Sequence, residues 1–237
     1  MSAGPTATYT GTANLEVMEA ARNYNTFLTA QVMAHARPGA AIVDFGAGTG
    51  TFAQRLTMAG YAVRCVELDP VLRHRLAAAG LGVYALTEEV PPASLDYIYS
   101  LNVLEHIEDD LGALRELRSR LKPGGRLMLY VPAFQSLYSS MDRLVGHFRR
   151  YRRHQLLALL RRAGFEIDGA RYCDSLGFFA TLAFKAIGND SGRLNERVVI
   201  FYDKFLFPLS RLLDRLLDRL LGKNLLVLAR RGGSDSI

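Results

Sequence analysis

Short apolar stretches of strand length alternate along this chain with stretches whose apolar residues recur at helical spacing. The strand-like stretches are residues 41–45, 62–68, 82–86, 95–101, 126–132, 165–173 and 224–230. Helical spacing covers residues 15–36, 50–59, 70–79, 108–121 and 153–163. Strands that alternate with helices form a sheet that is covered on both faces. The pattern therefore predicts a doubly wound α/β fold.

The regular alternation is absent at both ends and in two internal segments. Residues 1–13 and 232–237 are small, polar and glycine-containing, so we expect two flexible tails around one domain at 14–231. Residues 132–152 show no clear periodicity, and the alternation lapses again over 174–222. We expect these two segments to be insertions that cap a substrate site.

One helix is predicted inside the second insertion. The stretch RLLDRLLDRLLG, residues 211–222, places leucines on one stripe and arginines and aspartates opposite them. We interpret the leucine stripe as the face turned to the core and the charged face as solvated. The alternative is a helix that lies on a membrane surface, and the balance of Arg and Asp residues argues against it.

The composition fits one domain of an ordinary kind. Of 237 residues, 49% are hydrophobic, which suffices for one sizeable core. The two cysteines, Cys65 and Cys173, are too few for a disulfide framework, and the first thirty residues lack the pattern of a signal peptide. No uncharged apolar run is long enough to span a bilayer. We therefore expect a cytoplasmic protein that is not an integral membrane protein.

Positive charge is concentrated in one stretch of the chain. The formal net charge is +6, and HFRRYRRHQ, residues 147–155, holds four arginines and two histidines. This stretch is either a solvated helix start or a site for an anionic partner such as a phosphate-bearing substrate or a membrane surface. Nucleic acid is not expected, because no basic tail, recognition module or aromatic stacking motif accompanies the arginines. A peripheral membrane contact stays open.

Three glycines follow the first predicted strand in AIVDFGAGTG. Gly46, Gly48 and Gly50 come after Asp44 and lead into a helix. Glycine lets the backbone approach a ligand closely, and the helix N-terminus adds free N–H donors. Glu67 ends the second strand, where a carboxylate can accept both hydroxyls of a ribose. The stretch therefore predicts a cofactor with a ribose, although the spacing G-x-G-x-G departs from the G-x-G-x-x-G of dinucleotide enzymes.

Four motifs in a fixed order resemble the class I S-adenosylmethionine-dependent methyltransferases. VDFGAGTG resembles their first motif, VELDP the acid motif of the second strand, LDYIYSLNVLEHIED the fourth strand with its loop, and LKPGGRLMLYVP the fifth strand. These motifs cover residues 41–132, and NYN and MDRLVGHFRRYRRHQL resemble segments of one bacterial branch. The resemblance implies a Rossmann-like, seven-stranded sheet, mostly parallel with an antiparallel last strand, a helical cap, and S-adenosyl-L-methionine as cofactor.

For the cofactor, the resemblance implies contacts from the lead helix and from the ends of the first four strands. These residues are Tyr24, Asn25, Asp44, Gly46, Ala47, Gly48, Glu67, Leu68, Asp69, Thr87, Glu88, Asn102 and Val103. Asp44 would anchor the amino group, Glu67 the ribose diol, and Leu68 would pack on the adenine. Asp69 lies beside the ribose or only caps the following helix. The lead-helix pair closes over the carboxylate of the cofactor or serves only helix packing.

Methyl transfer from a sulfonium is an in-line displacement, so a protein mainly aligns the acceptor and removes its proton. We expect His106 and His147 as candidate bases; the alternative for His106 is a structural cap of its helix. The acceptor site is expected in the segment after the fifth strand, at Tyr138, Asp142, Arg149, Arg150 and Tyr151. Abundant aromatic residues in the two insertions favour an apolar or amphiphilic small molecule, with or without an anionic group. O-methylation is the default, and N- or C-methylation stays open.

A metal site is not expected. Glu105 and His106 resemble the loop with which quinone-type O-methyltransferases hold a divalent ion, but Asn102 stands where a further acid would be needed. No spacing of cysteine and histidine suggests zinc.

Three other functions are compatible with parts of this pattern. The same fold and cofactor could serve a cyclisation or rearrangement without methyl transfer, or a non-catalytic module that senses the cofactor or docks on a membrane-bound partner. An NAD-dependent oxidoreductase is disfavoured by the glycine spacing and by the LEHIED loop. The acceptor and the oligomeric state are not specified by the sequence.

Overall fold

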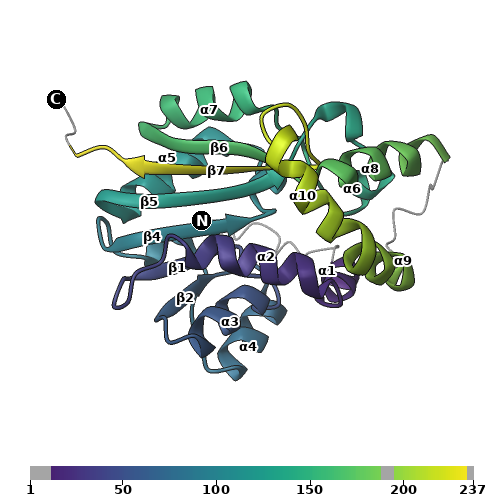
Figure 1. Ribbon diagram of the computed structural model, residues 1–237. Coiled ribbons are helices and arrows are strands. Elements are labelled where there is room, and N and C mark those ends of the chain that lie inside the picture. Colours follow the sequence, from purple (N-terminus) through teal and green to yellow (C-terminus); the bar gives the residue numbers. More distant parts are fainter. Residues whose placement is uncertain (1–11, 188–194, 234–237) are drawn as a thin grey trace.

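The computed structural model describes residues 12–187 and 195–233 (Figure 1). Most of the two predicted tails, 1–11 and 234–237, lies outside the described residues. Within the described part, residues 12 and 13 already belong to the first helix.

A seven-stranded sheet forms the centre of the molecule, in the order β3-β2-β1-β4-β5-β7-β6. The strands are β1 (Ile42–Phe45), β2 (Val63–Val66), β3 (Gly82–Tyr84), β4 (Leu95–Leu101), β5 (Leu121–Pro132), β6 (Phe165–Cys173) and β7 (Asn224–Arg231). β7 runs antiparallel to β5 and β6, and the other neighbouring pairs are parallel. The predicted Rossmann-like sheet with an antiparallel last strand is confirmed.

Helices cover both faces of this sheet and one of its ends (Figure 1). They are α1 (Thr12–Glu19), α2 (Arg22–Met33), α3 (Thr51–Met58), α4 (Pro70–Ala78), α5 (Asp110–Arg120), α6 (Ser140–Leu144), α7 (Arg153–Arg162), α8 (Ser175–Ile187), α9 (Glu196–Phe201) and α10 (Phe207–Leu217). Figure 1 shows α8, α9 and α10 gathered at the end of the sheet toward which β4 points.

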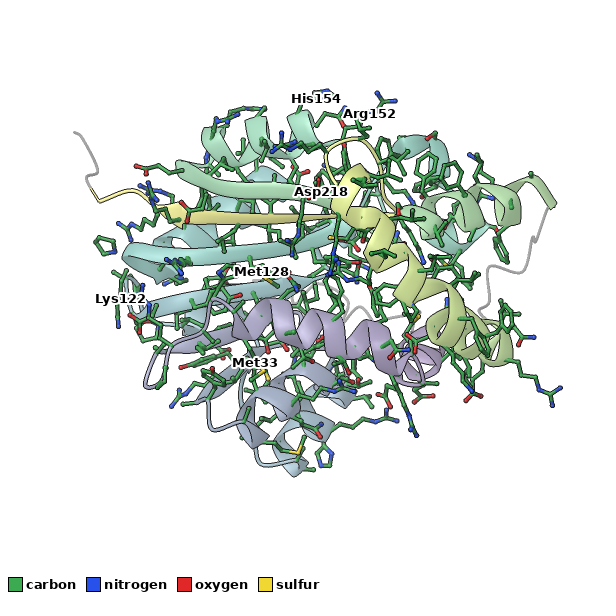
Figure 2. All side chains as sticks on the ribbon, in the orientation of Figure 1. Met33, Lys122, Met128, Arg152, His154 and Asp218 are labelled. Atoms are coloured by element: carbon green, nitrogen blue, oxygen red, sulfur yellow. The ribbon has the colours of Figure 1, made fainter. Side chains whose placement is uncertain are left out.

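The core has two layers, because successive strand residues point to opposite faces of the sheet. Tyr97 and Tyr99 pack on the side of α2 and α3, whereas Ile98 packs on the side of α5 and α7. Met128 on β5 and Met33 at the end of α2 belong to the first of these layers (Figure 2). The strands that hold the glycine loop are therefore fixed from both sides.

The prediction of one continuous lead helix over 15–36 is wrong. The chain breaks between α1 and α2, where the Asn25 side chain donates to the carbonyl oxygens of Met18 and Glu19 at 2.9 and 3.3 Å. The backbone N–H groups of Asn23 and Tyr24 donate to Asp203 at the start of α2. The free N–H groups at this helix end are thus satisfied by an aspartate 180 residues away in the sequence. The local pattern of apolar residues cannot reveal such a distant partner.

The helix predicted over 108–121 ends at Arg120, and the KPGG stretch that follows lies within β5. The pairing of β4 with β5 shifts register between Leu95 and Tyr97, which accommodates the two glycines of this stretch as an irregularity at the start of the strand.

The interpretation of the leucine stripe in 211–222 is also wrong. Leu212, Leu216 and Leu220 are exposed, and Asp214 from the face expected to be solvated is buried. Asp214 accepts the backbone N–H groups of Asp174 and Ser175 at 2.9 and 2.8 Å. The aspartate turns inward because it caps the N-terminus of α8, so the leucines turn outward. At the end of this segment the carbonyl of Asp218 accepts the Tyr172 N–H of β6 at 2.6 Å (Figure 2).

No helix in the described ranges is both long enough and apolar enough to cross a membrane.

Candidate functional site

A cavity of about 840 Å³ opens at the carboxyl ends of the parallel strands. All the residues predicted for the cofactor line it, as do His106 and His147. Residues that sequence reasoning did not single out also line it: Leu15, Met18 and Glu19 of α1, Leu86, Ile107, and Gly112, Ala113 and Glu116 of α5. The volume lies in the range of sites that hold small molecules and cofactors, about 300–1,000 Å³.

The glycine loop between β1 and α3 has a backbone that residues other than glycine rarely adopt. Gly46 has φ +74°, and a Cβ there would lie 2.4 Å from Cγ2 of Val103. Gly48 has φ +55°, and its N–H donates to Oε2 of Glu67 at 2.8 Å. The loop thus passes tightly under the β4 loop and is tied to the end of β2.

Three acids lie along the floor of the cavity. Asp44 is buried and accepts the hydroxyl of Tyr99 at 2.9 Å. Burial raises the pKa of Glu67, whose carboxylate accepts the N–H groups of Gly48 and Asp69. Asp69 accepts the N–H groups at the start of α4, so it does cap that helix, while it also lines the cavity.

One side of the cavity is lined by apolar side chains. Leu68 and Leu86 are both exposed large apolar residues that line it. Thr87 and Glu88 stand beside them on a short 3-10 helix, Thr87–Glu89. Exposed leucines at a cavity mouth offer a surface for a flat apolar group such as a purine.

The β4 loop and α2 close the opposite side. Asn102 adopts φ +55°, a left-handed backbone that costs free energy for a residue other than glycine. This conformation turns the chain so that Val103 packs over Gly46. Tyr24 packs edge-on against Phe207 of α10 at 5.6 Å between ring centroids, so the lead helix is fixed here by the cap.

Two histidines from different segments meet at the wall of the cavity. The rings of His106 and His147 form a T-shaped pair with centroids 4.5 Å apart. Burial, followed by the nearby charge of His147, lowers the pKa of His106 to about 4. His106 is therefore neutral at pH 7.

His147 is held by an ion pair beneath it. Its Nδ1 lies 2.7 Å from Oδ1 of Asp142, and Arg150 binds both oxygens of that carboxylate at 2.8 and 2.9 Å. Burial opposes ionisation of Asp142, but hydrogen bonds from His147 and Arg150 hold its pKa well below the usual range. With Asp142 ionised, the Nδ1–H of His147 can donate to Oδ1, which leaves Nε2 for a contact on the other side of the ring.

None of the five residues predicted to bind the acceptor lines the cavity. Besides the Asp142–Arg150 pair, Tyr138 donates its hydroxyl to the carbonyl of His147 at 2.6 Å. Arg149 and Tyr151 both donate to Oδ2 of Asp110, at 2.8 and 3.0 Å. Two arginines of the basic stretch, Arg149 and Arg150, are thus paired with acids of the protein itself, while Arg152 is exposed beside α7 (Figure 2).

The aromatic residues of the insertions also pack among themselves rather than along the cavity. Phe134 stacks on Tyr172 at 4.8 Å and meets Phe178 edge-on at 5.3 Å. None of these rings lines the cavity.

Glu105 was noticed in the sequence only as part of a metal motif. It is fully buried, and its two carboxylate oxygens have no hydrogen-bond partner. Burial raises its pKa to about 8, so the group is largely neutral at pH 7. Its Oε1 lies 3.8 Å from Nε2 of His147.

These three side chains are close enough to be considered as metal ligands. One ligand atom each from Glu105, His106 and His147 lies within 4.8 Å of the others. His147, which no metal motif in the sequence includes, completes the group because the segment after β5 folds back over the β4 loop. The absence of a metal stays a prediction.

The comparisons with known proteins agree with the family that the motifs of the glycine loop and the β4 loop indicate. A family model described as a methyltransferase domain matches residues 18–169, which is more than half of the chain. The chain belongs to this family. Its motifs place it among the class I S-adenosylmethionine-dependent enzymes.

Two curated relatives carry more specific names. A malonyl-[acyl-carrier protein] O-methyltransferase of Erwinia pyrifoliae is 31% identical over 180 residues, 70% of this chain and 67% of the relative. A ubiquinone biosynthesis O-methyltransferase of Xanthomonas campestris pv. campestris is 33% identical over 104 residues, 40% of this chain and 44% of the relative. The match thus spans less than half the length of the ubiquinone relative.

Solved structures share the fold across nearly the whole chain. An S-adenosylmethionine-dependent methyltransferase from Mesorhizobium loti has a TM-score of 0.58 at 20% identity and covers 85% of this chain and 96% of its own. The [4+2]-cyclase SpnF has a TM-score of 0.60 at 17% identity, with 96% and 97% covered. Since both a methyltransferase and a cyclase have this fold, the fold alone does not decide the reaction.

Proposed function

We propose that this protein transfers a methyl group from S-adenosylmethionine to a hydroxyl oxygen of an amphiphilic small molecule. The observation that supports it is the Asp142–His147 pair, whose histidine lines the same cavity as the glycine loop. The two curated O-methyltransferase relatives agree with transfer to oxygen.

The cavity fits the cofactor by its volume and by the groups that line it. Glu67 would accept the ribose hydroxyls, Asp44 would face the amino group, and Leu68 with Leu86 would cover the adenine. When bound, S-adenosylmethionine supplies the methyl group and the positive sulfur that activates it.

His147 is the proposed base for the hydroxyl proton. The proton of the acceptor would pass to Nε2, and the ionised Asp142 would stabilise the resulting imidazolium. His106 serves this role less well, because a base whose pKa is about 4 has little driving force to take a proton near pH 7. We assign His106 to the cavity wall beside the acceptor.

The base also favours one class of acceptor. A carboxylic acid is already ionised at pH 7 and needs no base, whereas a phenolic hydroxyl with a pKa of about 10 does. Apolar residues such as Met18, Phe52 and Ile107 make up much of the remaining wall. A phenol or catechol with an alkyl chain is therefore the acceptor we propose, and Tyr138, Asp142, Arg149, Arg150 and Tyr151 would position His147 and its loop rather than touch that acceptor.

A methyl-transfer assay tests this function. The purified protein is incubated with S-adenosylmethionine and either an alkylcatechol or a fatty acid of equal chain length, with and without EDTA, and products are analysed by mass spectrometry. We expect one added methyl group on the catechol, equal yield of S-adenosylhomocysteine, and no effect of EDTA. An isomer of unchanged mass, or methylation of the fatty acid alone, would contradict the proposal, and loss of turnover with EDTA would reassign the two histidines to a metal.

Cofactor affinity is expected to depend on pH through Asp44. Burial, offset in part by the Tyr99 hydroxyl and reinforced by the charge of Glu67, raises the pKa of Asp44 to about 7. A cationic amino group binds the carboxylate but not the neutral acid, so affinity for S-adenosylhomocysteine should rise as pH rises through 7, by up to about tenfold per pH unit below the pKa. Calorimetric titration at several pH values measures this. Asp44→Asn should bind more weakly with a flatter profile, and an equally steep profile in that variant would assign the pH dependence to another group.

A further inference from the structure

One continuous helical stretch turns a polar side toward the protein. It consists of α9, a π-helical turn (Tyr202–Leu206) and α10. Asp203, Ser210 and Asp214 of this stretch are buried. Asp203 and Ser210 are seven residues apart, and Ser210 and Asp214 are four apart, so the three lie on one face of a helix.

Each of these polar residues has partners that explain its burial. Asp203 accepts the N–H groups at the start of α2, and Asp214 accepts those at the start of α8. The hydroxyl of Ser210 donates to Asp174 at 2.9 Å and accepts the N–H of Leu176 at 2.9 Å. The inward side is thus largely occupied by helix capping, with Phe207 as its buried apolar side chain.

The outward side of the same stretch is apolar. Six large residues on it are exposed at successive spacings of three or four residues: Val198, Phe201, Phe205, Leu209, Leu212 and Leu216. Leu216 is 79% exposed. At 1.5 Å per residue these side chains extend over roughly 27 Å of helix. We call this row the outer stripe.

Cations accompany the outer stripe along one flank. At about 100° per residue, Arg197, Lys204 and Arg215 fall on the same side of the stripe, and Arg219 follows just beyond the end of α10. All four are exposed. Arg211 is not counted with them, because its guanidinium lies 3.5 Å from the Asp214 carboxylate and 3.8 Å from the centre of the Phe27 ring. The acids of the stretch oppose them little, because Asp203 and Asp214 point inward and only Glu196 and Asp218 remain near the surface.

We propose that the outer stripe docks on the surface of a bilayer that contains anionic phospholipid. Exposed phenylalanine and leucine side chains would enter the boundary between headgroups and acyl chains, and the flanking cations would meet lipid phosphates. The proposal does not depend on the acceptor or on methyl transfer.

Charge argues for lipid over a second copy of the chain. In an antiparallel pairing of two outer stripes, the cationic flank of one copy would meet the cationic flank of the other. In a parallel pairing, it would meet the opposite flank, where Leu206, Leu213 and Leu217 stand. Neither arrangement supplies a row of carboxylates to neutralise the cations, whereas anionic lipid does.

Vesicle cosedimentation of the full chain tests this proposal. We expect binding to vesicles of phosphatidylcholine with about 30 mol% phosphatidylglycerol, weak binding to phosphatidylcholine alone, and release by about 0.5 M salt. The triple variant Leu209→Gln, Leu212→Gln, Leu216→Gln should partition at least about tenfold less. The triple variant Lys204→Gln, Arg215→Gln, Arg219→Gln should lose a similar factor on the anionic vesicles only.

Matched controls use equally exposed positions elsewhere. Met58→Gln with Val71→Gln, and Arg161→Gln with Arg162→Gln, should leave vesicle binding unchanged. Equal binding of the wild type to both vesicle types, or equal loss in the controls, would overturn the assignment. So would a dimer in sedimentation velocity that binds no vesicles and becomes monomeric in the leucine variant.

A tryptophan reporter gives a second measurement that does not depend on weakened binding. The chain contains no tryptophan, so Leu216→Trp introduces a single fluorophore at the stripe. Its emission should shift to shorter wavelength with anionic vesicles and be quenched by brominated lipid, while Met58→Trp should show neither change. An unshifted Leu216→Trp in the presence of vesicles that bind the protein would place the contact elsewhere.

Discussion

Replacing His147 by alanine is expected to slow methyl transfer by about 10²–10⁴-fold, the range for loss of a general base. Oδ1 of Asp142 lies 2.7 Å from Nδ1 of His147 and can accept its N–H, so Nε2 is the atom that would take the acceptor proton. The loss corresponds to roughly 3–5 kcal/mol of transition-state stabilisation. The measurement is kcat with an alkylcatechol acceptor, together with calorimetric affinity for S-adenosylhomocysteine, which should stay within about threefold of the wild type.

Two further histidines serve as controls for this prediction. His154→Ala, on an exposed position of α7, should leave kcat unchanged (Figure 2). His106→Gln should have a smaller effect than His147→Ala, because the low pKa of His106 makes it a poor base. If His106→Gln abolishes turnover while His147→Ala retains more than about a tenth of it, the roles of the two histidines are reversed.

The sequence predicted the sheet, and it predicted that the glycine loop and the acids after the first two strands would meet, because both rest on local patterns. Alternating apolar stretches fix β1, β2 and β4, and a parallel arrangement brings their carboxyl ends to one edge. Asp44 lies near the end of β1, Gly46 comes directly after β1, and Glu67 comes directly after β2. Their positions at strand ends were therefore enough to predict that they meet in one cavity.

The cap could not be predicted in this way. From the sequence, Asp142 and Arg150 are predicted in the acceptor site, whereas their pairing beneath His147 depends on how a segment without periodicity folds back on itself. Asp214 belongs to a regular amphipathic pattern that normally faces solvent, but it caps a helix that starts forty residues earlier. In both cases a long-range polar contact outweighs the local pattern, because a buried helix end or charge without a partner costs more than an exposed leucine.

Replacing Asp142 by alanine is expected to destabilise the fold by about 3–5 kcal/mol, the cost of breaking a buried ion pair from one side. The carboxylate and the Arg150 guanidinium are almost inaccessible, and Asp142 also accepts the Ser139 N–H at the start of α6. Alanine would leave Arg150 charged and buried without its partner. Urea unfolding measures the loss, and a change below about 1 kcal/mol would mean that the pair is open to water.

The pH dependence and a matched pair sharpen this test. The folded-state pKa of Asp142 is lowered, so its stabilisation is complete above the unfolded-state pKa of about 3.9 and is lost as pH falls toward the folded-state value. The wild type should therefore lose this contribution in acid, and the alanine variant should lack it at every pH. Glu166→Ala, which breaks an exposed pair with Arg230, should cost at most about 1 kcal/mol. Asp142 also orients His147. The double variant Asp142→Leu with Arg150→Met should therefore regain much of the stability but not the turnover. This result would distinguish the contribution of the ion pair to stability from the contribution of Asp142 to catalysis.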